Sequence, residues 1–164
     1  MPLNDSLWTT TRKGEIDLMA MNVVKGWPLG GALDHNVAPT AGEGIVAGMF
    51  VKRSTVTGKL VKATGAVKEV AMFALDDQSA KDVVEADKIP LLIMNAICET
   101  DQFIAGAYVP QDELEVSPVP AEAGKIRKKL VAAAPTVGWV DDVVIVDGIP
   151  MLRFILIGPT GAAT

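Results

Sequence analysis

The sequence predicts an all-β fold, a small β-barrel or β-sandwich domain with an extended N-terminal arm. The chain has about eight to ten short runs of β-branched and aromatic residues, separated by turn residues every ~8–12 positions. Its 164 residues include 15 glycines and 10 prolines, which interrupt regular elements. No long stretch repeats apolar residues at helical spacing. Together these features favour many short strands over helices.

Residues 1–44 form the predicted arm, because glycine and proline cluster in it too densely for continuous elements. Within the arm, residues 16–24 contain one apolar run whose periodicity fits a strand or a short helix equally well. Residues 45–158 form the predicted domain, and 159–164 a short tail.

Five strands are expected in the first part of the domain. Each run is short and apolar and is bounded by glycine or polar residues. Gly48 lies inside the first run, as at a bulge or a close packing point. Residues 76–82 form a polar break, and residues 99–101 connect the last two strands. The expected strands are 45–51, 59–63, 68–75, 91–97 and 102–109.

The C-terminal third predicts a β-hairpin. Asp147-Gly148 separates residues 139–146 from residues 149–157, both rich in valine and isoleucine. This dipeptide is typical of the type I′ turn, which needs positive φ at both central residues. Pro150 cannot donate a ladder hydrogen bond, so it is expected near the start of its strand or at a sheet edge.

Composition excludes several classes of protein. A single cysteine cannot form an internal disulfide, and one cysteine with one histidine cannot build a Cys/His zinc site. A net charge of −5 argues against a nucleic-acid binder. The longest apolar run, 89–94, is far shorter than the ~20 residues of a membrane span, and the N-terminus lacks a signal-peptide pattern, so a soluble protein is expected. The mean hydropathy of +0.32 is high for a solitary domain, which suggests burial against other subunits.

No catalytic residue, cofactor or metal site is expected, and the protein is not predicted to be an enzyme. His35 is the only histidine, but it lies in the glycine-rich arm, where a surface or interface role is favoured over a general base. Cys98 ends an apolar run without basic neighbours, which favours a buried core residue.

Charged residues are segregated along the chain. Seven acids between residues 85 and 115 are expected to form a solvated acidic rim, namely Glu85, Asp87, Glu99, Asp101, Asp112, Glu113 and Glu115. Two basic clusters consist of Lys52, Arg53, Lys59, Lys62 and Lys68, and of Lys125, Arg127, Lys128 and Lys129. Patches of opposite sign suit assembly or docking on a charged surface. Ordinary solvated strand faces remain the alternative.

The three tryptophans receive different predictions. Trp139 follows Gly138 in an expected strand and is predicted to be core. Trp8 and Trp27 lie in the arm, where no local core exists, so they are candidate anchors in a neighbouring subunit. Packing of both on their own domain is the alternative.

The pattern across residues 38–157 resembles the head decoration, or cement, proteins of tailed bacteriophages. The match is one of style, and the 18-residue gap between Gly106 and Gly124 departs from it. It is carried by APTAGEGIVAG (38–48), GKLV (58–61), VAMFAL (70–75), GAYVPQDELEV (106–116), GKIR (124–127), VGWV (137–140) and LRFIL (152–156).

The resemblance implies a small β-barrel or β-tulip whose arm reaches over neighbouring capsid subunits, often in trimers. The implied partners are the phage major capsid protein and further copies of the chain, with no direct nucleic acid and no membrane. The protein would be made in the host cytoplasm and lie on the capsid exterior. The candidate interface residues are Trp8, Trp27, Leu29, His35, Lys52, Arg53, Lys59 and Lys62, and we expect the basic 52–68 face to meet acidic capsid surface.

Two other classes compete with this interpretation. A β-sandwich module that binds a sugar or a small acidic metabolite would be a monomer with a concave pocket, in which a tryptophan stacks on the ligand. A hydrolase would need Asp34-His35, or two facing carboxylates, in one cleft.

Overall fold

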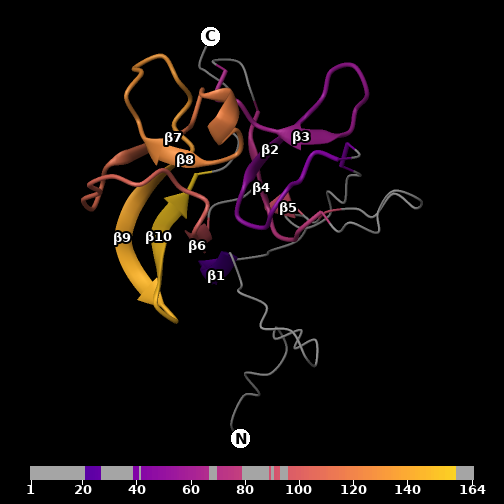
Figure 1. Ribbon diagram of the computed structural model, residues 1–164. Helices are drawn as coiled ribbons and strands as arrows, with labels where there is room; N and C mark the ends of the chain where they lie inside the picture. The colour runs from indigo at the N-terminus through magenta and orange to yellow at the C-terminus, as the bar shows by residue number, and fades with distance from the viewer. Residues whose placement is uncertain are drawn as a thin grey trace, which may run out of the picture.

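The computed structural model confirms the predicted all-β fold. It describes residues 21–26 (backbone only), 39–40, 42–66, 70–78, 89, 91–92 and 96–157. Ten strands in this part form two antiparallel sheets packed as a β-sandwich (Figure 1). The one helical segment there is the 3₁₀ turn η1 (Pro120–Glu122), and no helix in the described part is long and apolar enough to cross a membrane.

The larger sheet has six strands in the order β1-β6-β10-β9-β7-β8. Its outer strand β1 pairs with β6 and lies in the segment assigned to the arm, so at least residues 21–26 of that segment belong to the sheet. The strands are β1 (Met21–Gly26), β6 (Ala96–Thr100), β7 (Glu113–Val116), β8 (Ile126–Lys128), β9 (Gly138–Val146) and β10 (Ile149–Leu156).

The smaller sheet has four strands in the order β3-β2-β4-β5. The run expected as one strand over 91–97 is divided, because Leu91–Leu92 belong to this sheet and its last residues to β6 of the larger one. The first strand of the small sheet also differs from its expected range of 45–51. The first begins only at Phe50, because Ala47 and Gly48 form a turn in which Gly48 has a φ of 86°. The strands are β2 (Phe50–Arg53), β3 (Leu60–Lys62), β4 (Met72–Ala74) and β5 (Leu91–Leu92).

The main core lies between the sheets and is centred on three phenylalanines. Phe50 and Phe73 come from the small sheet and Phe154 from the large one, and all three are fully buried. Phe73 meets the other two rings edge-on, with ring centroids 5.3 Å and 5.6 Å apart. Such contacts add to the free energy of burial and join the two sheets.

A second apolar cluster covers the other face of the small sheet. Successive strand residues point to opposite faces, so Val51 and Leu60 face away from the phenylalanines. Both are fully buried beneath Ile45 and Ile89. The small sheet is therefore apolar on both faces.

The predicted C-terminal hairpin is confirmed. Asp147 has a φ of 50° and Gly148 a φ of 82°, the positive values that the type I′ turn requires. Pro150 is the second residue of β10 and lies opposite Ile145, so it is near the strand start, as expected. The turn sequence thus fixes the register of the longest strand pair in the described part.

The expected strand over residues 102–109 is not formed. Only Phe103 makes an isolated bridge, to Ile126, and the chain then folds back so that Tyr108 packs edge-on against Phe103. The Tyr108 hydroxyl donates a hydrogen bond of 2.5 Å to the Ile104 carbonyl oxygen. These contacts within residues 103–108 take the place of the hydrogen bonds that a strand would make with a neighbouring strand. The expected connection at 99–101 is also wrong, because β6 extends through Thr100.

Candidate functional site

The eight candidate interface residues divide into two groups. Trp8, Trp27, Leu29 and His35 lie outside the described residues. Lys52, Arg53, Lys59 and Lys62 lie on β2, on β3 and at the turn between them. Only the second group can be placed in the fold.

The basic residues of β2 and β3 do not share one sheet face. Val51 lies opposite Lys62 and Lys52 opposite Val61, and opposed residues of an antiparallel pair point to the same side. Lys62 therefore lies on the face of Val51, and Lys52 on the other. The Lys52 ammonium donates a hydrogen bond to Thr64 Oγ1 at 3.1 Å. The basic residues expected on one face are thus distributed over both faces of the small sheet.

Arg53 and Lys59 are the first and last residues of a hydrogen-bonded turn, residues 53–59, which we call the basic turn. The Ser54 hydroxyl accepts hydrogen bonds from the amides of Val56 and Thr57, both at 3.2 Å. The Ser54 carbonyl accepts the Gly58 amide at 2.8 Å. Val56 at its apex is 91% exposed. The basic turn therefore holds an apolar side chain in solvent between two exposed cations.

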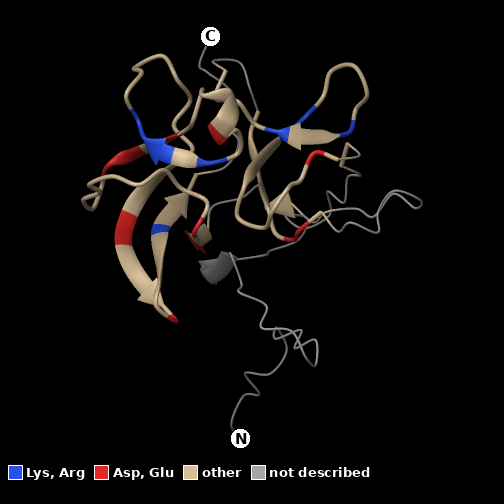
Figure 2. Ribbon diagram, viewed as in Figure 1, with Lys and Arg blue, Asp and Glu red and all other residues tan. Residues whose placement is uncertain are grey.

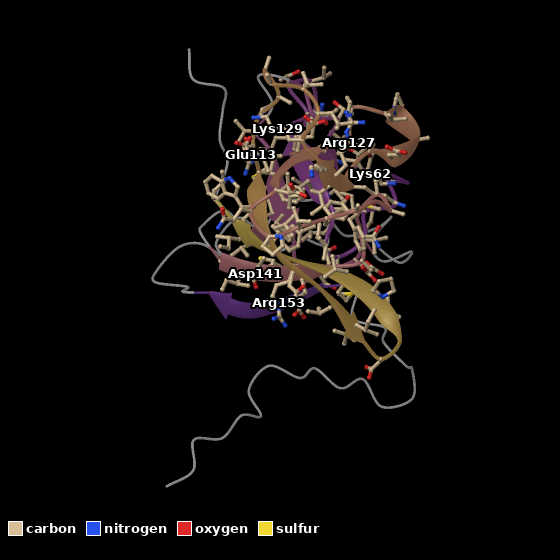
Figure 3. All side chains as sticks on the ribbon, turned by 90° about the vertical axis from the view of Figure 1, so that its left-hand side faces the viewer. Lys62, Glu113, Arg127, Lys129, Asp141 and Arg153 are labelled. Atoms are coloured by element: carbon tan, nitrogen blue, oxygen red, sulfur yellow. The ribbon has the colours of Figure 1, made fainter. Side chains whose placement is uncertain are left out.

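Three of the four cations in the second basic cluster pair with acids on or next to β7. Lys128 Nζ lies 2.7 Å from Asp112 Oδ1, and Lys129 Nζ lies 2.9 Å from Glu113 Oε2. These hydrogen bonds hold the pKa of both carboxyl groups below their ordinary values. Figure 3 shows Glu113 beside Lys129. Most of the positive charge in this cluster is therefore compensated by local ion pairs.

The expected acidic rim is wrong for two of its members. Glu115 and Glu99 are only 1% and 3% exposed. Arg127 lies opposite Glu115 on β8, with Nη2 2.8 Å from Oε1. Arg153 lies opposite Glu99 on β10, with Nη2 2.6 Å from Oε1. Cross-strand pairing thus buries carboxylates that sequence order alone places at strand ends. Glu85 and Asp87 lie outside the described residues.

The prediction for Trp139 is wrong, since its side chain is 39% exposed. The position that faces the core is that of Gly138, which has no side chain. A Cβ atom there would lie 2.9 Å from Phe154 Cδ2 and 2.5 Å from the Ile155 carbonyl oxygen. Trp139 therefore faces outward, opposite the partly exposed Ile155 and Glu113. The prediction placed the large residue inside and overlooked the glycine that lets the strands approach.

The prediction for Cys98 is confirmed. The residue is fully buried in the main core, and burial raises the pKa of its thiol to about 12. A thiol that stays protonated at neutral pH is a poor nucleophile and a poor metal ligand. In the part of the chain that the structure describes, no three His, Cys, Asp or Glu side chains gather as a metal site.

The largest feature that the sequence analysis missed is the exposure of the C-terminal hairpin. Strand β6 pairs with β10 only from Leu152 onward, and β7 pairs with β9 only at Gly138 and Trp139. Residues 141–150, which we call the hairpin tip, therefore extend past the other described strands of the sheet (Figure 1).

The hairpin tip carries apolar side chains in solvent. Val143, Ile145 and Val146 are 40%, 67% and 42% exposed. The run Val143–Val146 is apolar at every position. Neighbouring residues of a strand point to opposite faces, so a core on one face can cover only every second side chain of this run. That lack of alternation was the available signal. Val143 and Ile145 share one face of the hairpin and Val146 lies on the other, and exposed apolar side chains gathered on one element are typical of an interaction site.

Acidic residues frame these apolar side chains. Asp141, Asp142 and Asp147 are all exposed, and residues 141–150 contain no basic residue. Figure 2 shows the acidic band on β9 and the acidic end of the hairpin. The hairpin tip is therefore an apolar surface with negative charge around it.

No model of a known protein family, no curated protein and no solved structure matches this chain.

Proposed function

We propose that the protein is a structural protein of a tailed-bacteriophage head, which binds the outer capsid surface and cements neighbouring major capsid protein subunits. The observation that carries the proposal is the projecting hairpin tip, whose exposed Val143, Ile145 and Val146 are typical of a surface covered by other subunits of an assembly, and further copies of this chain are proposed among those subunits. The resemblance of residues 38–157 to head decoration proteins is the reason for proposing a bacteriophage capsid as the assembly.

The physical role follows from mass action. A protein that binds only the assembled shell lowers the free energy of that state, and a filled shell is under outward pressure. The proposed activity needs recognition and no chemistry.

In this proposal the arm contacts the shell, and Trp8 and Trp27 are its apolar anchors. Large aromatic side chains in well-packed pockets dominate the free energy of many interfaces. We expect Trp8→Ala or Trp27→Ala to weaken binding to empty shells by about tenfold or more, as measured by co-sedimentation at several protein concentrations. Unchanged affinity would remove that tryptophan from the mechanism, and a wild-type protein that ignores shells would overturn the proposal.

The competing proposal is a ligand-binding β-sandwich, and Trp139 is the observation in its favour. Its exposed indole lies opposite Glu113, whose carboxylate accepts hydrogen bonds from Lys129 and Thr136. An aromatic surface beside fixed polar groups can stack on a sugar ring. Titration of oligosaccharides against tryptophan fluorescence, with Trp139→Ala as control, separates the classes. A saturable change that this substitution abolishes favours the binding module.

A further inference from the structure

We infer that the hairpin tip of one copy binds the basic turn of a second copy, so that the protein associates head to tail. The inference rests on the self-association part of the proposed function and is independent of binding to a capsid. It assigns Arg53 and Lys59 to contacts between copies, in place of the acidic capsid surface expected from the sequence.

Charge complementarity selects a second copy as the occupant. The hairpin tip has three exposed aspartates and no cation of its own, and Arg153 opposite Asp142 is already paired with Glu99. Residues 52–62 have four cations and no acid, with the Glu43 carboxylate beside them accepting the Lys62 amide. Arg53 and Lys59 are exposed, and among the described residues neither lies in an ion pair. Opposite potentials speed encounter and fix the register of a contact. The chain thus carries both halves of a complementary pair.

Apolar side chains lie at the centre of both surfaces. Val56 is held at the apex of the basic turn, and Ile145 is the most exposed apolar residue of the hairpin tip. Both elements are preorganised, the first by the Ser54 hydrogen bonds and the second by its type I′ turn. Preorganised surfaces lose little conformational entropy when they meet. An apolar centre with a charged rim is the usual anatomy of an interface.

The positions of the two surfaces exclude their meeting within one molecule. Figure 1 shows the hairpin tip at the lower left and the turn between β2 and β3 at the upper right. The side view agrees, since Lys62 on β3 lies well above the end of the hairpin (Figure 3). A symmetric contact between two hairpin tips would bring like charges together, which is unfavourable. A head-to-tail contact avoids this and generates a ring or an open chain.

The contact is expected to be weak by itself. The hairpin tip has ten residues, whereas a stable interface takes about 20–30 residues on each side. Closure of a ring, or alignment on a surface, would strengthen it through effective concentration. We therefore expect association to become visible as the concentration approaches about 1 mM.

Charge reversal tests the inference. Sedimentation equilibrium at low salt should show that the wild type associates and that added salt weakens the association. Asp141→Asn with Asp147→Asn should reduce it at least tenfold, because asparagine removes the charge and still fits the turn. Arg53→Glu with Lys59→Glu should do the same.

Reversal on both surfaces gives the sharpest result. Asp141→Lys with Asp147→Lys should abolish association, and adding Arg53→Glu and Lys59→Glu to the same chain should restore it. An equimolar mixture of the two double variants should associate again although neither associates alone, because both contacts between unlike copies join opposite charges. Circular dichroism checks that each variant is folded, and the asparagine variant serves if lysine at position 147 prevents folding.

The apolar centre has its own matched pair of variants. Ile145→Asp should abolish association, whereas Leu130→Asp, at a 73% exposed position on another loop, should leave it unchanged. A monomeric wild type at about 1 mM, or equal loss with both variants, would overturn the inference.

The experiments distinguish failure of the contact between copies from failure of the proposed capsid function. Hairpin variants should stay monomeric and still bind shells through the arm, whereas Trp8→Ala should associate normally and bind shells less tightly. If no protein binds shells but charge reversal still controls association, the capsid role fails and the contact between copies stands.

Discussion

Glu115 shows how much a single cross-strand partner matters in this fold. Its carboxylate is 1% exposed and depends on Arg127 for compensation. Removing one member of a buried ion pair leaves the other charged and desolvated. We expect Arg127→Met to lower the free energy of unfolding by about 3 kcal/mol, measured by urea denaturation.

The neighbouring residue supplies the control. Lys128 pairs with Asp112, but its side chain is 48% exposed, so water compensates the loss of the pair. Lys128→Met should therefore change the unfolding free energy far less. Equal effects of the two substitutions would show that burial of Glu115 does not govern the energetics.

Cys98 predicts a specific alkaline instability. Its pKa is about 12 in the folded state against 9.0 ordinarily, so above pH 9 the unfolded state loses the proton first. The free energy of unfolding should then fall with rising pH, by at most about 1.4 kcal/mol per pH unit. Urea denaturation between pH 8 and 10.5 should show a steeper fall in the wild type than in Cys98→Ala. Parallel curves would contradict the assignment.

At the scale of elements, Gly138 permits β9 and β10 to approach. An added Cβ atom would meet backbone at 2.5 Å, which cannot yield as a flexible side chain can. We expect Gly138→Ala to destabilise the protein by about 2 kcal/mol in thermal or urea unfolding. Gly106→Ala is the control, because the nearest atom to its added Cβ would be 3.8 Å away. A harmless Gly138→Ala would refute the close approach.

Local signals in the sequence predicted the elements unevenly. Asp147-Gly148 identified the hairpin because a turn type depends on two adjacent residues. The expected strand at 102–109 failed because the edge-on packing of Tyr108 against Phe103 outweighs strand propensity. Trp139 was assigned to the wrong face because strand parity is set by its partner strands.

At the scale of the whole molecule, the class of fold was predictable but the order of strands was not. Strand β6 lies between β1 and β10, partners that are distant in sequence, and no local pattern encodes such pairings. The candidate site shares this limit. The basic turn was visible as a cluster of lysine and arginine, but the burial of Glu99 and Glu115 depends on long-range partners.

The two apolar layers of the small sheet differ greatly in size. Among the residues that the structure describes, six buried side chains form the outer layer and fourteen form the layer shared by both sheets. Segments with fewer buried contacts open at lower free energy than the molecule as a whole. Amide protons of β3 should consequently exchange with deuterium sooner than those of β10. The small sheet would then open locally while the C-terminal hairpin stays folded.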